Sequence, residues 1–167
     1  MRIAVLSDTH ARSPSPELQR EYEEEMQWMD AVLHCGDHTG EEVWAYLSVH
    51  PAFYAVRGNM DGSWADDVLP AKRSLQLRGF RLGMLHGHGL GSGDPARKLP
   101  AIFSGEFDLL CFGHTHRREL RRKEGGPVLL NPGSFTSPRD AKGAGYAIIQ
   151  IDADHGVHVR YKELAGS

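Results

Sequence analysis

The sequence predicts an α/β fold, and three observations support this class. Short apolar runs alternate with helix-period segments over the first third of the 167-residue chain, which is the pattern of strand–helix–strand units in a parallel sheet. Each apolar run ends in a polar cluster, as strands of open α/β sheets do at their ligand-binding ends. Later apolar runs are joined by short turns, which indicates antiparallel pairing. We expect one domain over residues 1–167.

The first part of the chain is expected to run strand, helix, strand, helix, strand. The strands are apolar runs stopped by polar residues, at residues 3–6, 31–35 and 53–56. The first helix, residues 17–29, starts at Ser15 or Pro16. It has an apolar stripe at helical spacing, formed by Leu18, Tyr22, Met26 and Met29. The second helix spans residues 41–49.

The second part of the chain mixes pairings. A hairpin is expected around Arg78-Gly79, and Asp94-Pro95 is typical of an N-cap followed by the first helical residue. The expected elements are strands 74–77 and 80–85, a helix at 94–103, strands 109–112 and 128–130, and a closing antiparallel pair, 146–151 and 157–161, around Asp154-His155-Gly156.

Composition narrows the class of protein. The chain is 40% hydrophobic and 25% charged, with a formal net charge of -3, so its overall field does not favour nucleic acid, although a local basic patch leaves that partner open. No apolar segment approaches the roughly 18 residues of a membrane span. The two cysteines, Cys35 and Cys111, form no CxxC pair. We expect a cytoplasmic protein with no membrane partner.

Metal-competent side chains follow five successive apolar strands. They are Asp8, His10, Asp37, Asn59, His86, His114 and His116. Alone, an aspartate or asparagine after a strand is usually a turn residue, but such groups at every strand end predict a metal site. Residues i and i+2 of an extended segment point the same way, so Asp8 with His10, and His114 with His116, are each expected to face one point.

The ligand types indicate the metal and the chemistry. Oxygen and imidazole donors without thiolate suit Mn²⁺, Fe²⁺ or Zn²⁺. Seven ligands exceed the needs of one ion and divide over two, with an aspartate as the bridge. Two ions roughly 3.5–4 Å apart suit the attack of water on phosphorus.

The motifs resemble those of the calcineurin-like metallophosphoesterases. The motifs, in chain order, are Asp8-Thr9-His10, Gly36-Asp37, Gly58-Asn59-Met60-Asp61, His86-Gly87-His88 and Gly113-His114-Thr115-His116. Together with Asn131-Pro132-Gly133-Ser134, they look like the small YfcE-type phosphodiesterase branch. The resemblance implies a four-layer sandwich of two mixed β-sheets packed face to face with helices outside. It also implies a supporting loop at residues 131–134.

The resemblance further implies a role for each ligand. One metal would be held by Asp8, His10 and His116, and the other by Asn59, His86 and His114. Asp37 would bridge two divalent ions, Mn²⁺ first, with Fe, Zn or Ni as alternatives. The implied activity is a metal-dependent phosphodiesterase that hydrolyses a small phosphate ester.

Met60 is a departure from much of the superfamily, where a histidine at this position helps to protonate the leaving group. Methionine cannot donate a proton, so we expect weaker general-acid help, by about 10²–10⁴ in rate for a poor leaving group. His88 is the candidate replacement, and its alternative role is to orient the site. The catalytic residues implied are Asp37, Asn59 and His88. Asp61 is expected to anchor its loop or hydrogen-bond a ligand.

Several alternatives stay open at this point. Phosphomonoesterase activity is one, and Arg73, Arg97 or Arg139 would then grip a terminal phosphate. A metal-binding scaffold module that resembles the retromer subunit of this fold is another. The basic cluster from Arg117 to Lys123 is either a charged strand edge or a phosphate-binding surface. Self-association into a dimer or tetramer would use exposed residues such as Trp28, Trp44 and Trp64, which are otherwise core.

Overall fold

Two five-stranded sheets pack face to face in the computed structural model, which describes residues 1–91, 93–122, 124–152 and 156–164. The first sheet has the order β10-β9-β1-β2-β3, built from β1 (Arg2–Leu6), β2 (Ala31–His34), β3 (Phe53–Ala55), β9 (Gly145–Asp152) and β10 (Gly156–Glu163). The second has the order β4-β5-β6-β8-β7, built from β4 (Lys72–Leu77), β5 (Phe80–Leu85), β6 (Leu109–Cys111), β7 (Arg118–Arg121) and β8 (Val128–Pro132).

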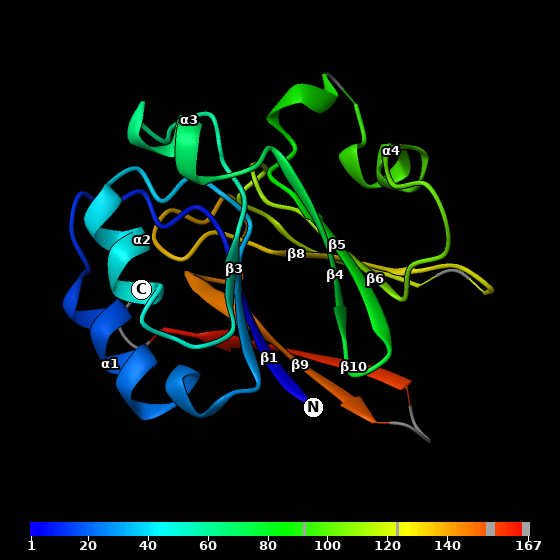
Figure 1. Cartoon of the computed structure of the whole chain (residues 1–167), viewed down its shortest axis with the longest axis horizontal. Helices are drawn as coiled ribbons and strands as arrows, with labels where there is room; N and C mark the ends of the chain where they lie inside the picture. Colours follow the sequence, from blue (N-terminus) through cyan, green and yellow to red (C-terminus); the bar gives the residue numbers. More distant parts are fainter. Residues whose placement is uncertain (92, 123, 153–155, 165–167) are drawn as a thin grey trace.

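Both sheets are mixed, as expected. Strands β1, β2 and β3 are parallel, and β9 and β10 add antiparallel strands at one side. In the second sheet β5, β6 and β8 are parallel, with antiparallel β4 and β7 at the edges. The helices lie outside the sheets (Figure 1) and are α1 (Pro16–Glu24), η1 (Met26–Trp28), α2 (Glu41–Leu47), α3 (Trp64–Val68), η2 (His88–Leu90) and α4 (Pro95–Ile102).

The buried strands are apolar on both faces because each sheet is covered twice. In β1, Ile3 and Val5 pack in the core between the sheets, and Ala4 and Leu6 pack under the helices; all four are fully buried. On the far side, α4 places Leu99 over the second sheet. The predicted four-layer sandwich is therefore confirmed.

The first predicted helix is shorter than expected. Ser15 does cap it, since its hydroxyl accepts a hydrogen bond from the Leu18 N–H. The helix ends at Glu24, because Glu25 adopts a non-helical φ of -134° and its carboxylate binds Lys162 and Arg160 from β10. The remaining residues of the apolar stripe, Met26 and Met29, lie in and directly after the short η1 turn, where both are buried. Tertiary pairing thus overrides the local helical pattern.

Sequence patterns located the hairpin but missed three short elements, α3, β7 and η2. Arg78 and Gly79 both have positive φ, at 48° and 90°, as a tight two-residue hairpin turn requires. The five-residue α3 is too short for helical periodicity to detect, and β7 was not predicted as a strand, although its edge position agrees with the charged-edge interpretation. The predicted turn at residues 154 and 155 lies outside the described residues.

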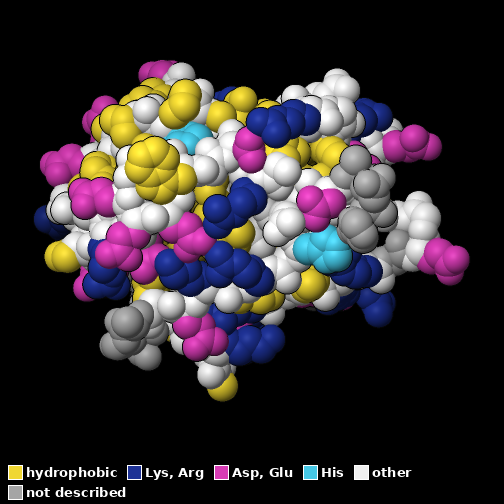
Figure 2. Space-filling model, turned by 90° about the horizontal axis from the view of Figure 1, so that it is seen from below, with side chains coloured by type: hydrophobic (Ala, Val, Ile, Leu, Met, Phe, Trp, Pro, Cys, Tyr) yellow, Lys and Arg dark blue, Asp and Glu magenta, His cyan; other side chains and the backbone are white. Residues whose placement is uncertain are grey.

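The surface is mixed in charge. On the face opposite the carboxyl end of β1, basic and acidic side chains lie next to one another (Figure 2).

Trp28 is 74% exposed, while Trp44 and Trp64 pack together with ring centroids 5.9 Å apart. Among the described helices, none is long and apolar enough to cross a membrane. The cytoplasmic location and the homo-oligomer stay predictions.

Candidate metal centre

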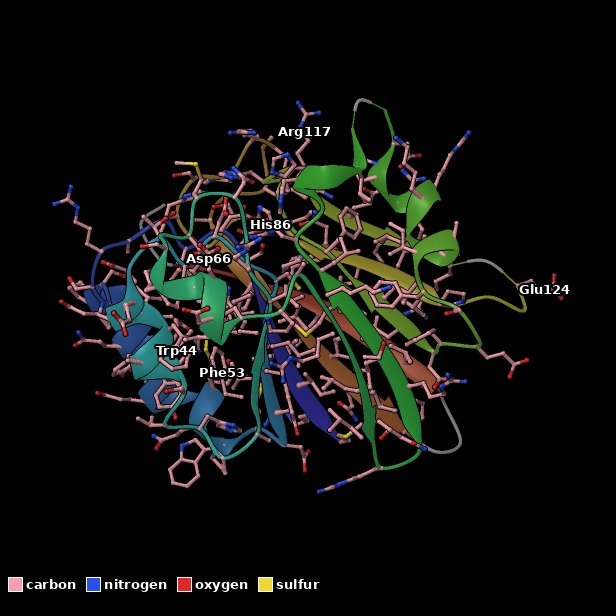
Figure 3. The ribbon with its side chains drawn as sticks, turned by 45° about the horizontal axis from the view of Figure 1, so that its top comes forward. Trp44, Phe53, Asp66, His86, Arg117 and Glu124 are labelled. Carbon is pink, nitrogen blue, oxygen red and sulfur yellow. The ribbon has the colours of Figure 1, made fainter. Side chains whose placement is uncertain are left out.

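The carboxyl ends of the parallel strands in both sheets meet at one edge of the sandwich. The loops that follow β1, β2, β5 and β6 bring Asp8, Asp37, His86 and His116 together there, although they are far apart in the sequence. Asp8 is fully buried, and the other three are at most 6% exposed. Figure 3 shows His86 inside the molecule at this edge. Buried charged and imidazole groups are costly unless something pairs with them.

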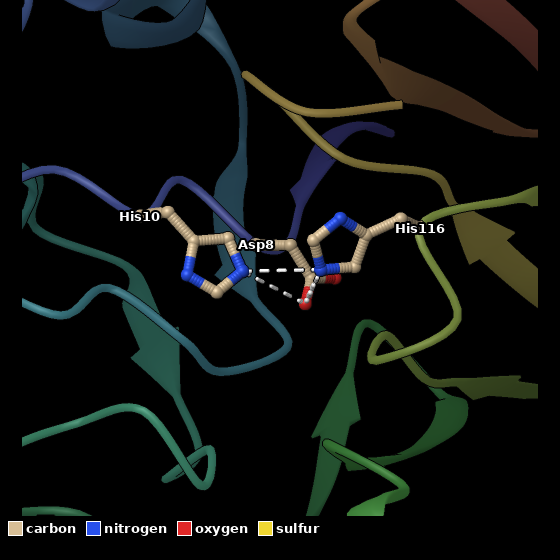
Figure 4. A group of neighbouring side chains, drawn as sticks. All are labelled: Asp8, His10 and His116. Carbon is tan, nitrogen blue, oxygen red and sulfur yellow. Dashed lines mark hydrogen bonds and ion pairs between the residues drawn. The ribbon is translucent and has the colours of Figure 1, made fainter. Parts of the chain in front are cut away.

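Asp8, His10 and His116 form the first group of potential ligands (Figure 4). His116 Nε2 lies 3.2 Å from Asp8 Oδ1, and His10 Nε2 lies 3.8 Å from the same oxygen. The two Nε2 atoms are 3.1 Å apart. Two imidazole nitrogens about 2.1 Å from one ion, at a right angle, would be about 3.0 Å apart. The spacing therefore fits two ligands of one metal ion.

Asp8, Asp37 and His86 form the second group. His86 Nε2 lies 3.2 Å from Asp37 Oδ2 and 3.9 Å from Asp8 Oδ1. Asp37 Oδ2 is also 3.7 Å from His10 Nε2. Each of the two carboxylates therefore faces imidazoles of both groups, which is the arrangement that two neighbouring ions would need.

The backbone fixes which nitrogen of each ring faces the centre. His86 Nδ1 lies 2.8 Å from the carbonyl of Cys35, and His116 Nδ1 lies 2.7 Å from that of Ser137. Because a carbonyl can only accept a hydrogen bond, both Nδ1 atoms carry the proton. Each Nε2 of the neutral ring then points a lone pair at a carboxylate oxygen. Asp8 Oδ1 and His86 Nε2 are buried and make no hydrogen bond with any described residue. A cation between such atoms would satisfy all of them.

The electrostatics of the site favour positive charge next to the two carboxylates. Burial lowers the pKa of His86, but the Asp37 and Asp8 carboxylates outweigh it, so the pKa is raised. The Asp8 carboxylate likewise raises the pKa of His116. Burial raises the pKa of Asp37, but the His86 ring more than offsets it, so the pKa is lowered. The two rings thus favour an added positive charge and Asp37 stays ionised, which suits a place where a metal ion would supply positive charge.

Backbone N–H groups orient both carboxylates. His114 N–H donates to Asp8 Oδ2 at 3.1 Å, and Met60 N–H donates to Asp37 Oδ1 at 2.8 Å. The second oxygen of each carboxylate is left to face the centre. The centre is thus held by hydrogen bonds before any ligand binds.

Left-handed backbone is concentrated in this region. Among non-glycine described residues, positive φ occurs at five predicted ligands, namely Asp8, His10, Asp37, His114 and His116, and also at Thr39 and Arg78. Such residues cost about 1–3 kcal/mol each and cluster at functional sites. They also correct one prediction: Asp8 and His10 do meet, but from left-handed turns and not by the alternation of an extended strand.

The remaining predicted residues surround these groups. The ring of His114 lies 5.2 Å from that of His86, between centroids, and the exposed His88 ring lies 5.5 Å from His86. Burial lowers the pKa of both His88 and His114. Asn59 is exposed and precedes Met60, whose N–H binds Asp37.

Asp61 anchors two loops of the centre. Its carboxylate accepts hydrogen bonds from the N–H groups of Asp37, Gly58 and Thr39, at 3.2, 2.8 and 2.8 Å. Burial opposes ionisation, but the His38 ring and these N–H groups outweigh it, so the pKa of Asp61 is well below its usual value. The loop-anchoring role expected for Asp61 agrees with this geometry.

The loop of residues 131–134 also supports the centre. The Asn131 amide donates to the Gly113 carbonyl at 2.8 Å, and the Ser134 hydroxyl donates to the Asp8 carbonyl at 2.7 Å. Sequence reasoning missed the carbonyls of Cys35 and Ser137, because main-chain acceptors have no side-chain signature. It also missed Thr39, whose N–H donates to the Asp61 carboxylate. The only sequence signal for Thr39 was its closeness to Asp37 in the chain.

Comparisons with a family model and with curated proteins bear on the family of this chain. Residues 1–154 match the family model of the calcineurin-like phosphoesterase superfamily domain. A probable metallophosphoesterase of Methanothermobacter thermautotrophicus is 33% identical over 83% of this chain and 80% of its own length. A protein named a phosphodiesterase in Methanocaldococcus jannaschii is 26% identical over 80% of this chain and 83% of its own.

Solved structures share the fold. A predicted phosphoesterase from Streptococcus pneumoniae superposes with a TM-score of 0.76 and 23% identity, over 99% of this chain and 93% of that one. Vps29 of Entamoeba histolytica, complexed with Zn²⁺, gives 0.72 and 22% identity, over 97% and 98%. At these identities the likeness concerns the fold alone.

Proposed function

Because the chain belongs to the calcineurin-like phosphoesterase superfamily, we propose that it hydrolyses phosphodiesters at a centre of two divalent metal ions. The observation that supports this most is the position of the two buried carboxylates. Asp8 Oδ1 and Asp37 Oδ2 each lie within 4 Å of imidazole nitrogens from both ligand groups. One ion would leave one of these groups unsatisfied.

The chain's own residues have distinct roles in this proposal. Asp8, His10 and His116 would hold one ion, Asn59, His86 and His114 would hold the other, and Asp37 would contribute to both. Bound divalent ions, with Mn²⁺ as the first candidate, would supply Lewis-acid charge and lower the pKa of a water. The carbonyls of Cys35 and Ser137 keep His86 and His116 in the tautomer that binds metal.

The surroundings of His86 suit the organic part of an ester. A hollow beside the centre is lined by Leu85, His86, His88, Leu90 and Ile102, among others. Met60 lies in the loop between β3 and α3 and is 54% exposed, and its side chain cannot donate a proton to a leaving group. The site is therefore suited to diesters with good leaving groups, and the name of the archaeal phosphodiesterase relative supports the same substrate class.

The proposal is tested with the Asp37→Asn variant and bis-p-nitrophenyl phosphate in the presence of Mn²⁺. Loss of the carboxylate between the two groups should lower kcat by about 10³-fold, since the charge at the centre falls. Asp67→Asn, an exposed aspartate in α3, is the matched control and should be unchanged. Equal rates for wild type and Asp37→Asn would refute the metal-dependent mechanism.

His88 is proposed as the group that helps the leaving oxygen depart. His88→Gln should slow the hydrolysis of diphenyl phosphate about tenfold more than that of bis-p-nitrophenyl phosphate. Phenol is the poorer leaving group and therefore depends more on a proton donor. His158→Asn, an exposed histidine of β10, is the control. If both diesters slow equally, His88 orients the site and gives no proton.

Two other functions have separate outcomes in these assays. Faster turnover of p-nitrophenyl phosphate than of either diester would favour a phosphomonoesterase. Metal binding without turnover of any ester would favour a scaffold role, in line with the fold shared with Vps29.

A further inference from the structure

His34 is a buried histidine that has no role in the centre as described so far. It is the last residue of β2, and its side chain is fully buried. Its Nδ1 accepts a hydrogen bond from the Gly36 N–H at 3.2 Å, and its Nε2 lies 3.2 Å from the Thr9 hydroxyl oxygen. Both ring nitrogens therefore have partners within the chain.

The backbone determines which nitrogen of this ring carries the proton. A backbone N–H can only donate, so His34 Nδ1 is unprotonated and the proton of the neutral ring is on Nε2. Nε2 therefore donates to Thr9 Oγ1, which lies 3.4 Å from the carbonyl oxygens of both Asp37 and His38 and can donate to either. The bonds run in one direction, and they leave His34 no lone pair with which to bind a metal ion.

This chain of hydrogen bonds joins the two loops that carry the carboxylates of the centre. Thr9 lies between Asp8 and His10 in the loop after β1, and Asp37 lies in the loop after β2. The main chains of the loops are paired as well, since His10 N–H donates to the Asp37 carbonyl at 3.1 Å. His34 adds a side-chain link between the same two loops.

A second ring fixes the orientation of His34. The rings of His34 and His38 are stacked, with centroids 3.6 Å apart and planes at 20°. His38 Nδ1 lies 3.4 Å from Asp61 Oδ2, which also accepts the Asp37 N–H. Both rings are fully buried, so water does not compete for their hydrogen bonds.

We propose that His34, acting through Thr9, is a positioning residue that sets the spacing of the Asp8 and Asp37 carboxylates. Asp8 Oδ1 and Asp37 Oδ2 each lie within 4 Å of imidazole nitrogens from both ligand groups, so a shift of one loop would change several of these distances together. Loss of a residue that orients metal ligands typically costs 10–100-fold in metal affinity. This inference rests on the proposed metal centre.

The test removes the Thr9 hydroxyl, because this breaks the chain and keeps every ring. Thr9→Val has a similar shape without the hydroxyl, and Thr9→Ser restores the hydroxyl. Thr9→Ala, which cannot clash, replaces the valine variant if that variant does not fold. Two quantities are measured: the dissociation constant of Mn²⁺ by calorimetry, and the hydrogen exchange of the His10 and Ala11 amides in metal-free protein. These amides donate to the Asp37 and His38 carbonyls.

His50 provides a matched control. It is also buried, its Nδ1 accepts from the Ala52 N–H at 3.1 Å, and its Nε2 lies 3.1 Å from the Met29 carbonyl. It has the same bonding pattern as His34 but lies near the amino ends of β2 and β3. His34→Phe and His50→Phe each keep a ring and lose both hydrogen bonds, and urea unfolding measures the stability of both.

Thr9→Val and His34→Phe should raise the Mn²⁺ dissociation constant about tenfold and speed exchange of the two amides about tenfold. Thr9→Ser should stay within about threefold of wild type. His50→Phe should lower the free energy of unfolding without changing either quantity, which separates positioning from general destabilisation.

The inference is overturned if exchange of the two amides is unchanged in Thr9→Val, if serine does not restore it, or if His50→Phe weakens Mn²⁺ binding as much as His34→Phe. It is also overturned if wild type binds Mn²⁺ and Thr9→Val binds it equally well. If wild type binds no Mn²⁺, the proposed function fails, and the exchange measurements alone decide whether His34 positions the two loops.

Discussion

Two of the places where the protein buries polar and charged groups differ in whether the groups satisfy one another. Around the buried Tyr146, the Tyr146 hydroxyl donates to Glu21 and Glu25, and Lys162 Nζ lies 2.7 and 2.8 Å from the same two carboxylates. At the strand ends, Asp8 Oδ1 and His86 Nε2 have no hydrogen-bond partner in the described chain. A self-satisfied cluster indicates a structural role, and a convergent unsatisfied one indicates a ligand site.

The backbone makes the same distinction. In the Tyr146 cluster, Glu21, Tyr146 and Lys162 lie in regular helix or strand, and Glu25 directly follows α1 with a negative φ of -134°. The strand ends use left-handed non-glycine backbone at five predicted ligands, which costs about 1–3 kcal/mol at each residue. The left-handed, strained backbone is thus concentrated at the residues that are proposed to bind metal.

Among the substitutions that test this comparison, Gly58→Ala is expected to have the largest effect, which is a loss of diesterase activity. A Cβ at this position would lie 2.0 Å from Asp37 Oδ1 and 2.3 Å from the Asp37 nitrogen, so Asp37 must move. We expect diesterase activity to fall about 100-fold, the effect of an ångström-scale misplacement. Steady-state kinetics with bis-p-nitrophenyl phosphate measure it.

Gly89→Ala is the matched control for that variant. A Cβ there would meet no atom within 4 Å, although the residue is next to His88. Activity should change less than about twofold. If both variants lose activity equally, the tight approach of Gly58 to Asp37 is not what positions the carboxylate.

A second effect is expected at the other cluster. Lys162→Met should lower the free energy of unfolding by about 2 kcal/mol, since it leaves Glu21 buried beside Glu25 without their shared cation; the partial exposure of Lys162 keeps the loss below that of a fully buried pair. Metal content and kcat should not change. Urea unfolding followed by fluorescence measures the loss, and a fall in kcat at constant metal content would contradict the separation of the two regions.

The smallest effect concerns the pH dependence of Glu25. Burial raises its pKa, but Lys162 outweighs that effect and holds the pKa below its ordinary value of 4.5. A carboxylate with a lowered folded-state pKa stabilises the fold above 4.5, and this contribution is lost as the pH falls through the folded-state value. Glu25→Gln should be less stable than wild type by up to about 1 kcal/mol at pH 7, and the difference should shrink below pH 4.5. A difference that grows on acidification would contradict the pairing.

Much of this picture could be predicted from the sequence, because buried strands are continuous apolar runs and the ligands follow them directly. The seven candidates came from that order, and the double-sheet fold was implied by the resemblance of the motifs to the calcineurin-like metallophosphoesterases. The left-handed turns at Asp8 and His10 could not be predicted, since neither residue type requires positive φ. The end of α1 at Glu24 had no local signal, since Glu25 pairs with Lys162 and Arg160, which are more than a hundred residues away. His34 resembled any other packing histidine until the fold brought its ring into contact with Thr9.

Metal stoichiometry tests the central claim most directly. Elemental analysis by mass spectrometry of protein dialysed against Mn²⁺ should give two ions per chain for wild type and for the surface variant His158→Asn. His86→Asn and His116→Asn should each retain about one ion, since each removes a ligand from a different group. Wild type that binds no ion, or only one ion that both variants retain, would contradict a two-metal centre built on Asp8 and Asp37.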